Sequence, residues 1–132
     1  MTQHIVLGVT GSIAAYKAVE IVSSLVKHGH CVTVIMTETA QRFIHPVTFR
    51  SISQNQVITD LFVDNESYNP NHVSLADRAD IIVVAPATAN FIGKVASGIA
   101  DDALTCTVMA ARSKVIIAPA MNDSMYSNPI VQ

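Results

Sequence analysis

The sequence predicts an α/β fold in which helices cover both faces of a parallel sheet, giving three layers. Four short apolar runs rich in β-branched residues recur along the chain, as in strands that are buried on both faces. Segments with helical periodicity separate these runs, so strand and helix alternate. Apolar residues make up 50% of the 132 residues, which suffices for the core of one domain. The predicted strands are residues 5–9, 32–36, 81–85 and 115–118.

Segment 12–28, between the first two strands, predicts an amphipathic helix. Its apolar residues recur at helical spacing, while most of its polar residues fall on the opposite side. Lys27 and His28 end the pattern and Gly29 follows, and a glycine just past a helix favours a left-handed C-cap. The chain is then free to enter the second strand.

The later helices are shorter and are predicted from breaks in the pattern. Segment 38–54 has a helical pattern interrupted at His45 and Pro46, which predicts two short helices. Segment 59–71 is polar and has no period, so we expect a loop there. A short helix beginning near His72 is expected to lead into the third strand. Further helices are expected at residues 88–98 and 102–112 and after residue 118.

Residues 1–132 are expected to form a single domain of the Rossmann-like or flavodoxin-like type. The chain stops where a helix opens after the fourth predicted strand, and an α/β domain seldom ends at such a point. We therefore expect the domain to be truncated at its C-terminus.

Composition limits the classes of partner. Charged residues make up 14% of the chain, the net charge is -2 and no basic cluster occurs, which argues against nucleic acid. The mean hydropathy is +0.39, but the apolar runs are too short to cross a membrane. Such an apolar small domain favours subunit contacts, so we expect a homo-oligomer. Without a recognisable export signal, we expect a cytoplasmic protein in which Cys31 and Cys106 are buried thiols.

Ligands of open α/β sheets bind beyond the carboxyl ends of the strands, and a loop of small residues follows each predicted strand here. In the first loop, Gly11 allows close backbone approach, and Ser12 stands near a helix start whose N–H groups suit a phosphate. The lack of a full GxGxxG favours a mononucleotide such as FMN over a dinucleotide. A simple cap remains the alternative for Ser12, and also for Thr37 or Thr39 in the second loop.

The third and fourth loops are also small and polar. Thr88 and Asn90 of the third loop can form hydrogen bonds with a flat ring, and no bulky side chain obstructs such a ring. The fourth loop carries the Asn122 amide at the strand exit. A helix start explains the third loop equally well, but four such loops at one edge favour a ligand site.

His72 is the histidine that we single out as a candidate catalytic residue. It ends the polar loop and begins the short helix before the third strand. A structural role remains the alternative, since a lone histidine is more often structural than catalytic. The sequence contains no metal-binding pattern and no Gly-x-Ser-x-Gly elbow, so it predicts neither a metal site nor a serine hydrolase.

Three motifs are familiar: GSIAAYK at 11–17, APATAN at 85–90 and PAMNDSMYSNP at 119–129. Together they resemble the homo-oligomeric flavin-containing cysteine decarboxylase family, and the resemblance extends over essentially the whole chain. Residues 72–75 resemble the stretch that carries the family's active-site histidine. The last motif is the most specific, and it matches the pattern P-x-M-N-x-x-M at Pro119, Met121, Asn122 and Met125, with Tyr126 where many members have tryptophan.

The resemblance implies FMN-dependent decarboxylation of 4'-phosphopantothenoylcysteine to 4'-phosphopantetheine in coenzyme A biosynthesis. FMN would oxidise the carbon–sulfur unit so that carbon dioxide can leave, and the reduced flavin would then return its electrons. The resemblance implies His72 as acid/base, Asn122 and Met125 as substrate-binding residues, and pockets between the subunits of a homotrimer or homododecamer. The family's flap cysteine would lie beyond Gln132, and Cys106 cannot take its role. The implied FMN ligands are Gly11, Ser12, Thr39, Thr88, Ala89 and Asn90.

Two alternatives stay open at this point. One is a peptidyl-cysteine decarboxylase of the same family, which differs mainly in its substrate. The other is a non-catalytic FMN-binding regulatory subunit, which the presence of both His72 and Asn122 disfavours.

Overall fold

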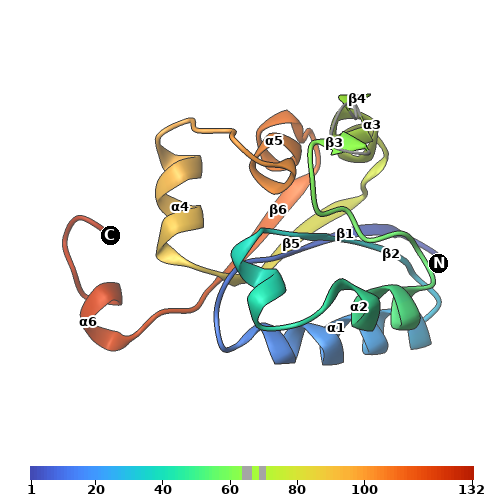
Figure 1. The fold of residues 1–132 in the computed structure, drawn as a ribbon, viewed down its shortest axis with the longest axis horizontal. Helices are drawn as coiled ribbons and strands as arrows, with labels where there is room; N and C mark the ends of the chain where they lie inside the picture. Colours follow the sequence, from blue (N-terminus) through green and yellow to red (C-terminus); the bar gives the residue numbers. More distant parts are fainter. Residues whose placement is uncertain (64–66, 69–70) are drawn as a thin grey trace.

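The central sheet confirms the predicted α/β fold. The computed structural model describes residues 1–63, 67–68 and 71–132, and for 62–63, 67–68 and 71–73 it describes the backbone alone. Within these residues, four parallel strands have the order β2-β1-β5-β6 (Figure 1). Each strand contains the run predicted for it. The strands are β1 (His4–Val9), β2 (Cys31–Met36), β5 (Ile81–Ala87) and β6 (Lys114–Pro119).

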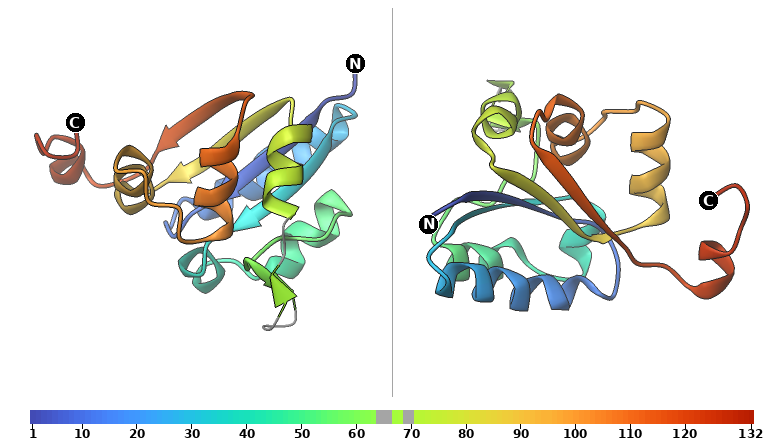
Figure 2. Two further views of the ribbon diagram at one scale, coloured as in Figure 1. Left: turned by 90° about the horizontal axis from the view of Figure 1, so that it is seen from above. Right: turned by 180° about the vertical axis from the view of Figure 1, so that it is seen from behind.

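Helices lie on both faces of this sheet, as Figures 1 and 2 show. Helices α1 and α2 cover one face, α3 and α5 cover the other, and α4 rises from the sheet at its carboxyl edge. Among the described residues, no helix has the length and apolar character needed to cross a membrane. The helices are α1 (Ala15–Lys27), the 3-10 helix η1 (Thr39–Arg42), α2 (Pro46–Ser53), α3 (Asn71–Arg78), α4 (Ala89–Ala96), α5 (Ala103–Ala110) and α6 (Asp123–Tyr126).

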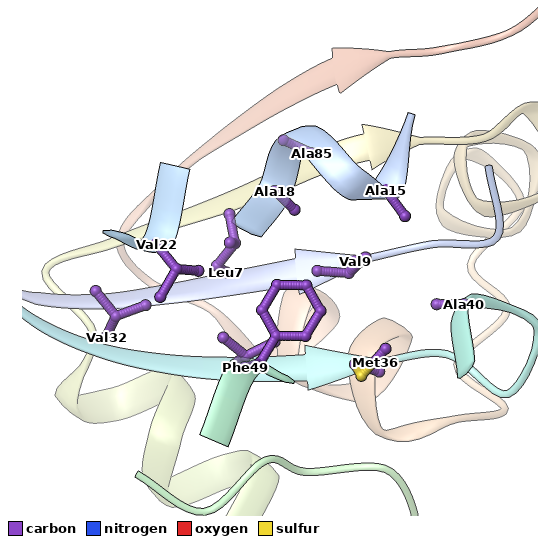
Figure 3. Close-up of a cluster of buried hydrophobic side chains, with 11 residues drawn as sticks. Leu7, Val9, Ala15, Ala18, Val22, Val32, Met36, Ala40, Phe49 and Ala85 are labelled. Atoms are coloured by element: carbon purple, nitrogen blue, oxygen red, sulfur yellow. The ribbon is translucent and has the colours of Figure 1, made fainter. Parts of the chain in front are cut away.

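Each face of the sheet has its own apolar core. Leu7 and Val9 of β1 pack with the buried faces of α1 and α2, where Phe49 is the largest side chain (Figure 3). Val6 of the same strand points the other way, into a core that contains Leu104 of α5. Successive residues of β1 thus serve opposite cores, which explains why the run is apolar throughout rather than alternating.

The helix ends confirm most of the predicted signals and correct one. Gly29 has φ +87° just after α1, and His45 caps α2 by accepting a hydrogen bond from the Val47 N–H at 3.1 Å. At the start of α1, however, Ala14 occupies the N-cap position and no side chain caps the helix. The Ser12 hydroxyl instead accepts a hydrogen bond from the Ala14 N–H at 3.1 Å. A cap at Ser12 itself is therefore wrong.

The polar segment 59–71 is not entirely a loop. It contains two short antiparallel strands, β3 (Phe62–Val63) and β4 (Ser67–Tyr68). Residues 64–66 and 69–70 lie outside the described residues, so the loop prediction stands untested there. Strands of two residues carry no detectable period, which explains why the sequence did not predict them.

Strand β6 is the exposed edge of the sheet. Among the described residues it pairs only with β5, and most of its residues are exposed. Ile116 and Ile117 point to opposite faces and are 44% and 38% exposed. Apolar side chains on both faces of an edge strand form a surface suited to a further contact.

Gly8 allows α5 to pack closely on β1, and its substitution is expected to destabilise the fold. A Cβ atom at position 8 would stand 2.4 Å from Cδ1 of the buried Leu104. We expect Gly8→Ala to lower the free energy of unfolding by about 1–3 kcal/mol, measured by urea denaturation.

Gly93→Ala is the matched control, because a Cβ atom at position 93 in the middle of α4 meets nothing within 4 Å. This change is expected to raise the free energy of unfolding by about 0.5–1 kcal/mol, since alanine favours a helix over glycine. Equal effects of the two substitutions would contradict the role assigned to Gly8.

Candidate functional site

A cavity of about 770 Å³ opens at the carboxyl edge of the sheet. The chain passes from β1 to its neighbour β2 on one side of the sheet, and from β5 to its neighbour β6 on the other side. The cavity lies between β1 and β5, where these two directions diverge, which is the usual ligand position in such sheets. Its volume falls within the range of small-molecule sites. The walls come from the loops after β1, β2 and β5, from residues 59–61, from α4 and from the start of α5.

The first two loops approach each other closely at Gly11. A Cβ atom at position 11 would stand 2.3 Å from Cγ2 and 2.6 Å from Cβ of Thr39. The backbone carbonyl carbon of Thr39 would lie at 3.2 Å, so rotation of the threonine side chain gives no relief. Gly11 is therefore required by the close approach of two loops that both line the cavity.

Thr10 ties the first loop to the third. Its buried hydroxyl donates a hydrogen bond to the Pro86 carbonyl oxygen at 2.6 Å and accepts one from the Thr88 N–H at 3.0 Å. Strand β5 also continues two residues beyond its predicted end, so Pro86 lies in the strand rather than in a loop. Thr10 is not among the sequence-predicted site residues, because a threonine after an apolar run gives no sign of contacts 76 and 78 residues away.

Thr39 and Asn90 have polar side chains that are available to a ligand. Both line the cavity, and neither side chain forms a hydrogen bond to the residues that the structure describes. In the second loop the cap is Thr37, whose hydroxyl accepts a hydrogen bond from the Ala40 N–H at 3.2 Å. This contact decides between the two threonines that the sequence left open, and it leaves Thr39 unbonded. Thr88 caps α4 by accepting from the Phe91 N–H at 3.3 Å, and its hydroxyl proton can still be donated.

Three helices start near the cavity, and they differ in how their first N–H groups are satisfied. Helix α4 has the neutral Thr88 cap, whereas α5 has the Asp102 carboxylate, which accepts a hydrogen bond from the Thr105 N–H at 2.7 Å. Helix α1 has no side-chain cap. Since a carboxylate repels a phosphate and a free helix start attracts one, an anionic group is best accommodated near α1.

The structure does not bring every predicted site residue to the cavity. Gly11, Thr39, Thr88 and Asn90 line it, whereas Ser12 and Ala89 are the chain neighbours of lining residues. Asn122 and Met125 belong to the exposed end of the chain around α6, which lies beyond the tip of β6 and apart from the other helices (Figures 1 and 2).

His72 lies in the first turn of α3, and only its backbone is described. Helices α3 and α5 pack against each other, and each leads into the amino end of a strand of the same sheet. The first turn of α3 is thus on the side of the molecule where α5 begins, and the start of α5 lines the cavity.

The far wall of the cavity is formed by residues that are not among the sequence-predicted site residues. They belong to α4, to the short connection at 97–102 and to the start of α5, which returns to the carboxyl edge. One signal was present, since Asp102 followed three residues later by Thr105 is a capping-box pattern that marks a helix start. These residues are Phe91, Lys94, Asp101, Asp102, Ala103 and Thr105.

The two cysteines are less buried than predicted. Both are free and only partly buried, so the prediction of fully buried thiols is wrong. The Cys106 thiol donates a hydrogen bond to the Ala100 carbonyl oxygen at 3.4 Å. Desolvation raises the pKa of this thiol, and the negative charges of Asp102 and Asp101 raise it further. Cys106 is therefore held as a neutral thiol near neutral pH and does not resemble an activated nucleophile.

Removal of the Thr10 hydroxyl is expected to loosen the first and third loops. Thr10→Val keeps the shape of the side chain but leaves the Thr88 N–H without its partner, and among the described residues the Pro86 carbonyl keeps only the Thr10 backbone N–H at 3.3 Å. We expect a loss of about 1–3 kcal/mol in the free energy of unfolding, measured by urea denaturation.

Thr107→Val is the matched control. Thr107 is also buried, but its hydroxyl bonds only to the Ala103 carbonyl oxygen within α5, which the helix backbone already satisfies. A smaller effect is expected there, and a larger loss at position 107 than at position 10 would contradict the bridging role of Thr10.

Comparison with known proteins places this geometry in context. The chain is 52% identical over 130 residues to the coenzyme A biosynthesis bifunctional protein CoaBC of Bacillus subtilis (strain 168), covering 98% of this chain and 32% of that protein. It is 42% identical over 134 residues to the probable phosphopantothenoylcysteine decarboxylase of Streptococcus mutans, covering 100% of this chain and 75% of that protein. The chain thus spans about a third of the length of the bifunctional relatives that it matches.

A solved structure and a family model agree with these relatives. The crystal structure of the FMN-dependent cysteine decarboxylase TvaF from thioviridamide biosynthesis has a TM-score of 0.91 and 35% identity, covering 98% of this chain and 80% of that one. The sequence model of the Flavoprotein family matches residues 1–132. With the fold, the carboxyl-edge cavity and this match in agreement, the chain belongs to the Flavoprotein family.

Proposed function

We propose that this chain is the FMN-binding decarboxylase unit that converts 4'-phosphopantothenoylcysteine to 4'-phosphopantetheine in coenzyme A biosynthesis. The observation that carries the proposal is the cavity at the carboxyl edge, with the unbonded side chains of Thr39 and Asn90 near the uncapped start of α1. The relatives named for coenzyme A biosynthesis and for phosphopantothenoylcysteine decarboxylation match nearly the whole of the chain.

The residues present fit FMN. A flat ring needs small residues at its approach, and Gly11, Ala89 and Ala120 follow closely after β1, β5 and β6. A phosphate needs a helix start that carries no side-chain cap, and α1 has such a start, where among the described residues the Ser12 hydroxyl accepts a hydrogen bond only from the Ala14 N–H. Hydroxyl and amide groups at Thr39, Thr88 and Asn90 can serve the rest of the cofactor.

FMN, when bound, supplies a reversible two-electron oxidation of the carbon–sulfur unit, which a decarboxylation next to an ordinary methylene thiol requires. We assign to His72 the movement of a proton at the substrate, because it begins the helix that packs beside α5. We assign the substrate carboxylate to Asn122, with Met125 beside it. The Asn122 Oδ1 atom already accepts hydrogen bonds from the Met125 N–H and the Ser124 hydroxyl, so its NH₂ group is left to donate.

The relatives favour a small molecule over a peptide as substrate. The proteins named for coenzyme A biosynthesis or for phosphopantothenoylcysteine decarboxylation are 52% and 42% identical to this chain, compared with 26% for the solved structure named peptidyl-cysteine decarboxylase EpiD. A peptidyl-cysteine decarboxylase therefore remains the second candidate for the same chemistry, and comparison of the two substrates separates them.

We further propose that residues 1–132 act as one flavin-binding unit within a cytoplasmic homotrimer or homododecamer. Exposed apolar side chains on β6 and around α6 support self-association, since isolated small domains rarely expose so many. Two free thiols agree with a reducing compartment. The exposed apolar side chains in question are Ile116, Ile117, Met125, Tyr126 and Ile130.

The purified protein is expected to carry the absorbance of oxidised flavin and to release carbon dioxide from 4'-phosphopantothenoylcysteine. We expect His72→Asn to retain flavin and to lower the rate of carbon dioxide release by about 10²- to 10⁴-fold, the usual contribution of a general acid or base. His45→Asn is the matched control, because His45 caps α2 and asparagine caps equally well. Protein that neither holds nor takes up FMN would overturn the proposed function, and full activity of His72→Asn would remove its assignment to His72.

Asn122→Asp is expected to raise the KM for the substrate by about 10- to 100-fold, because it removes an amide donor and sets a carboxylate against a carboxylate. The cap of α6 should survive, since aspartate accepts the same hydrogen bonds that Asn122 Oδ1 accepts now. Asn128→Asp is the control, because the Asn128 Oδ1 atom accepts a comparable hydrogen bond from the Ile130 N–H at 2.8 Å. An unchanged KM in Asn122→Asp would exclude Asn122 from carboxylate binding.

A further inference from the structure

Residues 97–102 connect α4 to α5 without regular structure, and hydrogen bonds from both helices fix their backbone. The Ile99 N–H donates to the Lys94 carbonyl oxygen at 2.8 Å, and Gly98 has φ +75°, which ends α4 in a left-handed turn. The Cys106 thiol holds the Ala100 carbonyl oxygen at 3.4 Å. The connection is thus fixed from both of the helices that it joins.

Lys94 holds the connection at two points. Its ammonium group donates to both carboxylate oxygens of Asp101, at 3.1 and 3.0 Å, while its backbone carbonyl receives the Ile99 N–H. The Lys94 side chain is 28% exposed and that of Asp101 is 53% exposed, so the pair stands at the surface but is partly shielded from water. One residue of α4 therefore holds the connection through both its main chain and its side chain.

The ion pair between Lys94 and Asp101 forms part of the wall of the cavity. Phe91 and Lys94 line it from α4, and Asp101 and Asp102 line it from the connection and the start of α5. Asp102 is in turn committed to capping α5 through Thr105. A shift of the connection would move both carboxylates relative to α4, and with them the side of the cavity that faces α5.

Charge explains why this wall needs a cation. Besides Lys94, the charged residues that line the described part of the cavity are all acidic, and they include Glu38, Asp101 and Asp102. Neighbouring carboxylates without a cation repel each other, which would loosen the connection that carries Asp101 and Asp102. The Lys94 ammonium neutralises Asp101 where the two side chains meet.

We propose that Lys94 is a positioning residue, whose ion pair with Asp101 fixes the α4–α5 connection as the far wall of the flavin cavity. The proposal rests on the proposed function, because it assigns FMN to this cavity. Lys94 acts through Asp101 and not by touching the phosphate, so its effect does not depend on the phosphate of the ligand.

The test compares binding of FMN and of riboflavin, which lacks the phosphate, by quenching of flavin fluorescence. We expect Lys94→Met and Asp101→Asn each to weaken both ligands by the same factor, about two- to five-fold, the size expected of a partly exposed ion pair. The double variant should bind no more weakly than either single one, and exchanging the two residues, Lys94→Asp with Asp101→Lys, should restore affinity. Lys94→Arg should bind as the unaltered protein does.

Lys27→Met is the matched control, because Lys27 is an exposed lysine in the last turn of α1 and lies outside the cavity lining. It should leave both affinities unchanged. The proposal is overturned if Lys94→Met weakens FMN alone while Asp101→Asn leaves FMN binding unchanged or tighter, since Lys94 would then contact the phosphate directly. Additive losses in the double variant would overturn it as well.

Amide hydrogen exchange separates this proposal from the proposed function. In ligand-free protein, Lys94→Met and Asp101→Asn should both speed exchange of the amides at 98–102, whereas Lys27→Met should not. If the unaltered protein bound no flavin, the proposed function would fail. The exchange data would still show whether the ion pair between Lys94 and Asp101 fixes the connection. Unchanged exchange in both variants would remove the positioning role of Lys94.

Discussion

The carboxyl ends of four parallel strands meet at one edge of the sheet, and every part of the candidate site depends on this constraint. Loops that are far apart in the sequence are brought side by side only because β1 pairs with β2 on one side and with β5 on the other. The hydroxyl of Thr10 then joins the exits of β1 and β5 through two hydrogen bonds. Backbone pairing of the strands and one buried side chain thus hold the loops around the cavity in place. Rigid scaffolds commonly position functional loops in this way.

Local signals in the sequence predicted the strands and most helix boundaries, and long-range contacts account for what it missed. Apolar runs and the Gly29 and His45 signals act within a few residues, so they were readable and were confirmed. The burial of Thr10 and the return of α5 to the cavity depend on partners distant in the chain. The same holds for β5, which continues to Ala87 because its end pairs with Pro119 of β6. Periodicity along the sequence does not reveal these long-range contacts.

The capping pattern also divides the edge of the sheet electrostatically. A carboxylate caps the start of α5, a neutral hydroxyl caps the start of α4, and the N-cap residue of α1 provides no side-chain cap. Each cap residue decides whether a helix start remains open to an anion. A capping role and a role in ligand binding are therefore not alternatives at this edge of the sheet. Asn122 extends this principle, because its cap fixes which end of the side-chain amide is left to donate.

The contact between Gly11 and Thr39 restricts how this site can vary. The conflict at position 11 involves Cβ and the backbone carbon of residue 39, not only the outer methyl group. Serine or alanine at position 39 would keep its Cβ and therefore would not make room for a side chain at position 11. Transfer of one of these loops into a related protein should preserve the fold only when the other loop is transferred as well. The loops that carry Gly11 and Thr39 are therefore expected to change together in evolution.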